Sequence, residues 1–331
     1  MDEAINGSSP DYETLLNVAA ELNKMKPWNY FDNGDIIAIQ LDEMKYFVSV
    51  MGAGGQEYGL MMYDEEFGYA SLEKIINNKP LSDDFSFDLS ALTINYVNRD
   101  ELEKEDYQLI KDQGLSFRGK KNWIALRKYT PGFLPHHPDD LDTEDMIEIV
   151  KILIGLTKMR MDGWEYPNVP LNVFPAFEME NEEIHLLGHL QMDRIEKAPL
   201  EIEVNELDIA KIKKKQKSAL EIEFAYFYLQ SVTLNEDGQP IYPLIQVVAD
   251  HSTGQILGNE IIPFPKHSFV QQQLFWQMLK NFPVCPNKIL VDKETHRILE
   301  SVADLIGIEL VISTLPNIKD FKEMLKMHPQ F

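Results

Sequence analysis

The chain has 331 residues, too many for one typical hydrophobic core, so two or more domains are expected. Apolar residues make up 44% of it and charged residues 26%, which is typical of a folded globular protein and excludes a wholly disordered one. The net charge of −23 opposes the phosphate contacts on which non-specific nucleic-acid binding depends, so a nucleic-acid partner would need a local basic patch.

The N-terminal half mixes helices and strands. Residues 1–10 are expected to form a loose leader, and the helical spacing of apolar residues then predicts a helix that Pro27 ends. Short apolar runs predict strands, the first three joined by tight turns into an antiparallel sheet, at residues 36–39, 46–50, 58–63, 92–97 and 123–126. Further helices are predicted at residues 69–76, 99–113 and 143–161, the last N-capped at Asp142 or Thr143.

A cluster of prolines between residues 167 and 175 indicates a domain boundary. The chain then divides into a leader and helix (1–26), an α+β domain with a mixed antiparallel sheet (27–166), and an α/β domain (176–331). A hairpin of residues 176–179 and 184–190, followed by a linker, opens the second domain.

The C-terminal half shows a clearer order of elements. A strand-like segment at 219–234 precedes a hairpin of strands 244–249 and 255–262 around a tight turn. Helices and strands then alternate, with helices at 269–281, 294–306 and 318–327 and strands at 288–291 and 309–312. This alternation predicts a mixed sheet with parallel crossovers and flanking helices.

The N-terminal half resembles an uncharacterised bacterial domain family over about residues 27–165. The resemblance depends on Trp28, Trp123, Pro131-Gly132 and segments 48–52, 58–60, 98–100 and 114–119. It implies a bacterial origin and a shared fold, but no activity. The glycines of segment 52–59 lack the lysine of a P-loop and a following helix, so they predict a hairpin connection that binds no nucleotide.

The segment 247–258, with sequence VVADHSTGQILG, resembles the second and third strands of integrase and transposase cores, which have the ribonuclease H-like fold. The resemblance extends over residues 221–327. It implies three carboxylates that converge on two metal ions. Asp292 matches the second carboxylate, and Glu323 or Asp320 lies near the place of the third.

The first carboxylate of that family belongs on the opening strand, here placed at residues 224–234, which contain no Asp or Glu. Asp250 matches a turn position of the family. Asp292 also has a structural interpretation, as the N-cap of the helix that follows it. We therefore expect a degenerate ribonuclease H-like module without catalytic activity and without a cofactor.

Three functions follow from these observations. The leading hypothesis is a non-enzymatic interaction or structural module whose partner is unknown and is expected to be another protein. The first alternative is a nuclease that uses Mg²⁺ or Mn²⁺ with Asp250, Asp292 and Glu323. The second is a nucleic-acid binder that does not cleave, through a basic patch drawn from Arg118, Lys120, Lys121, Arg127, Lys211, Lys213 and Lys214.

The location of the protein can also be predicted. No apolar run reaches the length of about 18 to 20 residues that crosses a bilayer, so no membrane partner is expected. A single cysteine, Cys285, fits a reducing compartment. These features predict a cytoplasmic protein. The adjacent His136 and His137, like the His185 and His189 pair, are expected to belong to structural segments and to hold no metal.

Overall fold

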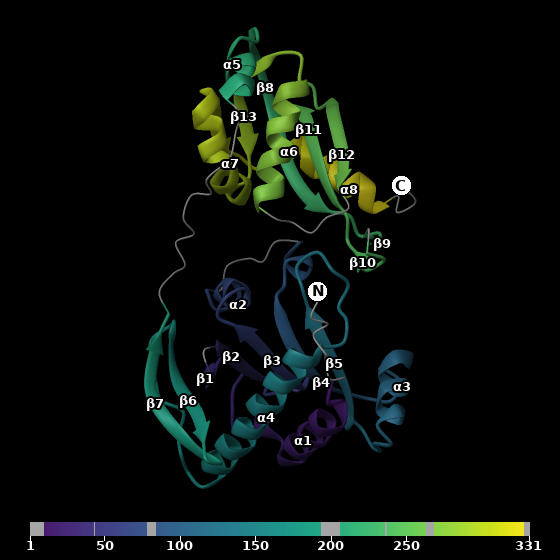
Figure 1. The fold of residues 1–331 in the computed structure, drawn as a ribbon, viewed down its shortest axis with the longest axis vertical. Coiled ribbons are helices and arrows are strands. Elements are labelled where there is room, and N and C mark those ends of the chain that lie inside the picture. The colour runs from purple at the N-terminus through teal and green to yellow at the C-terminus, as the bar shows by residue number, and fades with distance from the viewer. Residues whose placement is uncertain are drawn as a thin grey trace, which may run out of the picture. The chain divides into compact units, whose positions relative to one another are not determined.

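A computed structural model describes residues 10–42, 44–77, 84–192, 206–235, 237–262 and 268–327 (Figure 1). These residues divide into two compact units. The N-terminal unit contains the described residues up to position 83 and those in the ranges 89–130 and 135–195. The C-terminal unit contains residues 84–88, residues 131–134 and the described residues from 196 onward. Residues 1–9 of the expected leader (1–10), and the chain at 193–205, where the linker was expected, lie outside the described residues.

The N-terminal unit is built on a seven-stranded sheet in the order β5-β4-β3-β2-β1-β6-β7. All neighbouring strands are antiparallel except β1 and β6, which are parallel. The strands are β1 (Ile37–Leu41), β2 (Met44–Met51), β3 (Gly59–Asp64), β4 (Ala91–Val97), β5 (Trp123–Tyr129), β6 (Val173–Glu180) and β7 (Glu183–Gln191). The expected mixed antiparallel sheet with helices is confirmed, and the glycine-rich segment after Met51 connects β2 to β3 as a hairpin.

Helices cover both faces of this sheet. The main core joins α1 (Tyr12–Met25) and α4 (Asp140–Met161) to one face, and α2 (Tyr69–Ile76) packs on the other. The helix α4 begins at Asp140, earlier than predicted, because Asp139 and Asp142 form a reciprocal capping box. The helix α3 (Lys104–Asp112) begins later than predicted, because Glu101 accepts a hydrogen bond from the Asn98 N–H and closes a turn there.

The hairpin expected at the start of the second domain belongs instead to the N-terminal sheet. Its two strands are β6 and β7, and β6 pairs with β1 at Ala38 and Ile39. The prolines before it therefore mark no boundary between the two sheets. The pairing of β6 with β1 begins at Ala176, directly after Pro175, so the missing N–H of that proline interrupts none of the pairs with β1.

The C-terminal unit has a five-stranded sheet in the order β12-β11-β8-β13-β14. Its strands are β8 (Lys217–Tyr228), β11 (Leu244–Asp250), β12 (Ile256–Ile262), β13 (Cys285–Val291) and β14 (Glu309–Ile312). β11 runs antiparallel to β8 and β12, whereas β13 runs parallel to β8 and β14. The predicted arrangement, a hairpin on one side of the opening strand and a parallel strand on the other, is confirmed.

The bounds of the opening strand differ from the prediction. The strand β8 begins at Lys217 and ends at Tyr228, so residues 229–234 leave the sheet and β9 (Thr233–Leu234) pairs with β10 (Pro240–Ile241). The strand therefore contains two glutamates, Glu221 and Glu223. The expectation that the opening strand carries no acidic residue is wrong.

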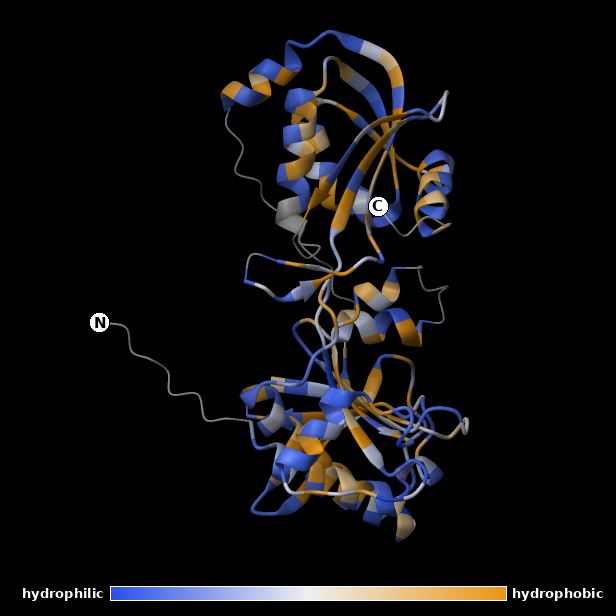
Figure 2. Cartoon of the chain, turned by 90° about the vertical axis from the view of Figure 1, so that its right-hand side faces the viewer, coloured by the Kyte–Doolittle hydropathy of each residue, from blue (hydrophilic) through white to orange (hydrophobic). Residues whose placement is uncertain are grey.

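Helices also cover both faces of the C-terminal sheet. The larger core places α6 (Ser268–Asn281) and α7 (Lys293–Ile306) on one face, with α5 (Glu206–Lys213) beside them. On the other face α8 (Pro316–Met327) packs on β8 and β11. Figure 2 shows the hydrophobic residues concentrated on the strands and on one side of the helices. Within the part of the chain that the structure describes, no helix is both long enough and apolar enough to span a membrane.

Candidate functional site

The carboxylates predicted for a nuclease site have separate local roles. Asp250 ends β11, and its Oδ1 accepts hydrogen bonds from the backbone N–H and the hydroxyl of Ser252, which closes the turn to β12. These hydrogen bonds lower the pKa of Asp250. Asp292 is the N-cap of α7, as the structural interpretation predicted, and accepts hydrogen bonds from the Thr295 N–H (2.8 Å) and hydroxyl (3.0 Å). Glu323 lies on α8 and pairs with Lys326.

The structure therefore does not bring the predicted triad together. Among the described residues, no three His, Cys, Asp or Glu side chains lie close enough to hold a metal ion. Asp250, Asp292 and Glu323 are all described, so their nuclease geometry is not found. The alternative third ligand, Asp320, also lies on α8 and forms no such group.

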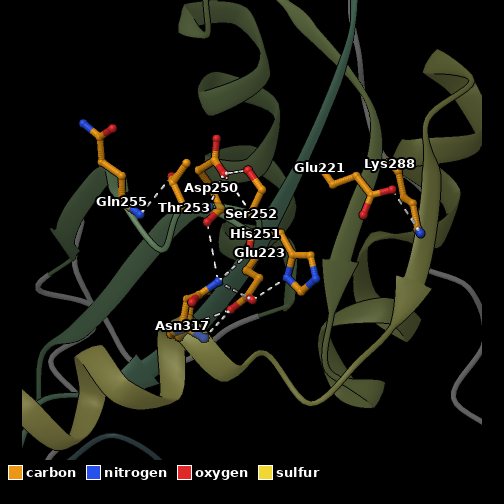
Figure 3. Close-up of polar contacts among 10 residues, drawn as sticks. Glu221, Glu223, Asp250, His251, Ser252, Thr253, Gln255, Lys288 and Asn317 are labelled. Atoms are coloured by element: carbon orange, nitrogen blue, oxygen red, sulfur yellow. Dashed lines mark hydrogen bonds and ion pairs between the residues drawn. The ribbon is translucent and has the colours of Figure 1, made fainter.

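The carboxylate that the sequence prediction missed is Glu223, in the middle of β8. It is fully buried, yet it lies within a polar cluster (Figure 3). Its Oε2 accepts hydrogen bonds from the backbone N–H groups of Asn317 (3.0 Å) and Ile318 (3.1 Å). Its Oε1 accepts one from Nδ2 of Asn317 (2.9 Å) and lies 2.7 Å from Nδ1 of His251. Both carboxylate oxygens are thus occupied by groups of the chain itself.

Two segments supply the partners of Glu223, the first turn of α8 and the turn after β11. Asn317 and Ile318 lie in the first turn of α8, where backbone N–H groups have no partner within the helix and carry a partial positive charge. His251 follows β11, and its backbone N–H donates to the carbonyl of Glu221. The Nδ2 of Asn317 also donates to the His251 carbonyl at 3.0 Å. Glu223 therefore ties α8 and the β11–β12 turn to the central strand.

This cluster is suited to anchoring elements rather than to hydrolysis. A magnesium ion is held by carboxylate oxygens with free lone pairs, and those of Glu223 face hydrogen-bond donors. The His251 side chain is 36% exposed, and because its Nδ1 faces Glu223, only Nε2 of the ring is left for another ligand. The neighbouring acidic side chain, Glu221, pairs with Lys288 at 3.4 Å. One imidazole nitrogen is a single ligand, too few for a metal centre without further groups.

The predicted basic patch of the N-terminal unit is largely neutralised. Arg127 binds both oxygens of Asp106, at 2.5 and 2.8 Å, and also pairs with Glu103. Lys121 pairs with Glu101 at 3.0 Å. Arg118 and Lys120 are exposed, and within the described residues neither has an ion-pair partner. Two of the predicted cations in this unit are therefore accessible to a ligand.

The second predicted patch lies in and after α5. Lys211 pairs weakly with Asp208 at 3.5 Å, and Lys213 and Lys214 are exposed. The ammonium group of the nearby Lys215 is already engaged, because it donates hydrogen bonds to three carbonyls at the end of α6. Such a contact compensates the partial negative charge of a helix C-terminus.

In the described part of the chain, the histidines predicted to be structural belong to no group of three side chains that could hold a metal ion. Nε2 of His137 lies 2.9 Å from Oδ1 of Asp106, whose side chain is almost fully buried. Burial alone would raise the pKa of Asp106, but hydrogen bonds from Arg127 and His137 outweigh it and hold that pKa below its usual range. His185 and His189 lie on β7, opposite Glu178 and Pro175.

Two comparisons with protein families cover most of the chain. Residues 12–167 match a domain of unknown function (DUF7309). Residues 208–326 match a second domain of unknown function (DUF6930). No curated protein matches the chain. The prediction that the N-terminal half resembles an uncharacterised domain family is confirmed, and neither match supplies an activity.

Proposed function

We propose that this chain is a non-catalytic interaction or structural protein, whose C-terminal unit uses a degenerate ribonuclease H-like scaffold. The strand order β12-β11-β8-β13-β14, with β11 alone reversed, supports the comparison with that fold. The observation that carries the proposal is Glu223. The one buried carboxylate on the described central strand has its oxygens bound by α8 and His251, and it is unavailable to a metal.

The register of the sheet supports the same proposal. Glu223 is paired with Leu290 of β13, so Ala225 stands level with Asp292, two residues further along each strand. A metal ligand that cooperated with Asp292 would be expected near Ala225, which is buried and has only a methyl side chain. Two-metal hydrolysis requires carboxylates that bind both ions. The nuclease that would use Asp250, Asp292 and Glu323 is thus the less favoured alternative.

A nuclease assay tests the proposal directly. Wild type and Asp292→Asn are incubated with single-stranded DNA, duplex DNA, RNA and hybrid substrates in Mg²⁺ or Mn²⁺. Asparagine is as good an N-cap as aspartate, so this variant removes the charge and keeps the helix start. We expect neither protein to cleave above a metal-only control. Cleavage by wild type that Asp292→Asn abolishes, with an unchanged circular dichroism spectrum, would overturn the proposal.

The remaining parts of the proposal concern partner and location. We infer a bacterial, cytoplasmic protein that uses no cofactor, and its single cysteine, Cys285, is buried and unpaired. A protein partner fits the net charge of −23 better than a nucleic acid does. Non-cleaving nucleic-acid binding stays the alternative, because Arg118 and Lys120 are exposed. Binding of single-stranded DNA that weakens with salt and is lost in the double variant Arg118→Glu, Lys120→Glu would favour it.

A further inference from the structure

The N-terminal unit contains a cleft of about 750 Å³ that none of the sequence motifs indicated. One wall is the chain around residues 29–36, and the other is residues 163–174, between α4 and β6. Its volume lies in the range of pockets that hold small organic ligands, roughly 300 to 1,000 Å³. It is therefore large enough to be a binding site in its own right.

The cleft carries a negative charge. Its charged lining residues are Asp32, Asp35 and Glu165 against Arg160, which gives three negative charges minus one positive, or −2. Arg160 is engaged with the backbone of both walls. Its Nε and Nη2 donate to the Tyr30 carbonyl at 2.8 and 2.5 Å, and Nη1 donates to the Trp164 carbonyl at 3.0 Å. The guanidinium holds the walls together and leaves the carboxylates unpaired with it.

Asp35 is the least exposed of the three acidic residues that line the cleft. Among the described residues, its carboxylate accepts one hydrogen bond, from the Asp32 N–H at 2.9 Å. Burial raises the pKa of Asp35, and the charge of Asp32 adds to that rise, against the lowering effects of the Asp32 hydrogen bond and of Arg160. A cation placed beside this carboxylate would stabilise its charged form.

Two further features favour a ligand that donates hydrogen bonds and carries positive charge. Oδ1 of Asn172, on the wall of the cleft, is buried and accepts no hydrogen bond from the described residues. Trp164 and Tyr166 line the same cleft, with ring centres 6.5 Å apart. The Tyr166 hydroxyl donates to the Ile36 carbonyl, which fixes its ring in the wall. Aromatic faces attract organic cations and cover their carbon chains.

We propose that this cleft binds a small organic cation, an alkyl guanidine or alkyl amine, with the cationic group at Asp35 and the carbon chain against Trp164 and Tyr166. The ligand's N–H groups satisfy acceptors that the chain leaves open. The site lies within the N-terminal unit and is independent of the role proposed for the C-terminal unit.

Nuclear magnetic resonance of the full chain with ¹⁵N-labelled tryptophan tests this site. The chain has four tryptophans, and the Trp164→Phe variant identifies the indole signal of the cleft. Butylguanidine is titrated against butylurea, its neutral isostere, and butyrate, its anionic counterpart. We expect a saturable shift of the Trp164 signal with butylguanidine, and affinity at least about tenfold weaker for butylurea, which corresponds to 1.4 kcal/mol.

Variants identify the carboxylate. Asp35→Asn keeps an oxygen that accepts the Asp32 N–H but removes the charge, and should weaken butylguanidine binding about tenfold. Asp100→Asn, an exposed position away from the cleft, should bind as wild type does. The other three indole signals report whether each variant stays folded. The proposal is overturned by the absence of a saturable Trp164 shift, by equal binding of butylurea or butyrate, or by unchanged affinity in a folded Asp35→Asn.

Discussion

Substitution of Glu223 by glutamine should destabilise the C-terminal unit strongly. An amide supplies one acceptor oxygen where the carboxylate supplies two. If that oxygen keeps the N–H groups of Asn317 and Ile318, both bonds change from charged to neutral, at a cost of about 1 kcal/mol each. The new NH₂ group then faces Nδ2 of Asn317, another donor, and that lost bond costs about 1 to 3 kcal/mol. The sum is about 3 to 5 kcal/mol.

The chain offers a matched control two residues away. Glu221 lies on the same strand and the same face as Glu223, but its side chain is 44% exposed and forms one ion pair, with Lys288. Glu221→Gln should therefore cost at most about 1 kcal/mol.

Hydrogen exchange followed by mass spectrometry measures the amide exchange rates of β8 and α8 separately from those of the N-terminal unit. In Glu223→Gln their amides should exchange about a hundredfold faster or more, since 1.4 kcal/mol corresponds to tenfold. Strands of the N-terminal unit should exchange at the wild-type rate. If Glu223→Gln and Glu221→Gln change exchange in β8 and α8 equally, the anchoring role of Glu223 is wrong.

Three further predictions concern other positions. Asp292→Ala should cost about 1 kcal/mol in chemical denaturation, because the Thr295 N–H loses its cap, while Asp292→Asn should cost far less. Asp106→Asn should lower the stability of the N-terminal unit by about 3 kcal/mol at neutral pH, because Arg127 loses a buried partner. The folded pKa of Asp106 is depressed, so its stabilisation is present above the unfolded pKa of about 3.9 and is lost as pH falls through the folded value. Acid unfolding followed by circular dichroism should accordingly be less steep in Asp106→Asn. Nucleotides should leave the melting temperature unchanged, and a rise that Gly54→Val abolishes would contradict the hairpin interpretation of that loop.

The strand order of the C-terminal sheet was more accessible from the sequence than the polar cluster was. Apolar runs and a tight turn located the hairpin of β11 and β12 and the short strand β13, and β11 and β13 are buried along most of their length. The segment Glu221-Ile222-Glu223 lies within the strand-like segment 219–234, but the strand expected to carry the first carboxylate was placed at residues 224–234. The groups that compensate Glu223 come from His251 and Asn317, 28 and 94 residues away, and no local pattern reveals such partners.

The hairpin of residues 176–190 was assigned to the wrong sheet for a related reason. Prolines close together are typical of linkers, and the sequence after α4 contains Pro167, Pro170 and Pro175. The parallel pairing of β6 with β1 joins residues about 140 positions apart, at Ala38 and Ala176. Periodicity predicts that a strand exists but not which strand it joins. The cleft was missed in the same way, since its two walls lie far apart in the sequence.

The docking of α8 on β8 explains why the anchoring of α8 by Glu223 and a metal site near Ala225 exclude each other. Ile318, Phe321 and Leu325 pack in the cluster that contains Ala225 and Phe227, so an apolar side of this helix covers the part of β8 level with Asp292. Glu323 lies between the packed positions and is about half exposed. A carboxylate introduced at Ala225 would enter an apolar cluster without a partner, at a large desolvation cost. The same docking places the first N–H groups of α8 on Glu223. Restoring convergent metal ligands would therefore require α8 to leave the sheet, and Glu223 would then lose the donors that α8 supplies.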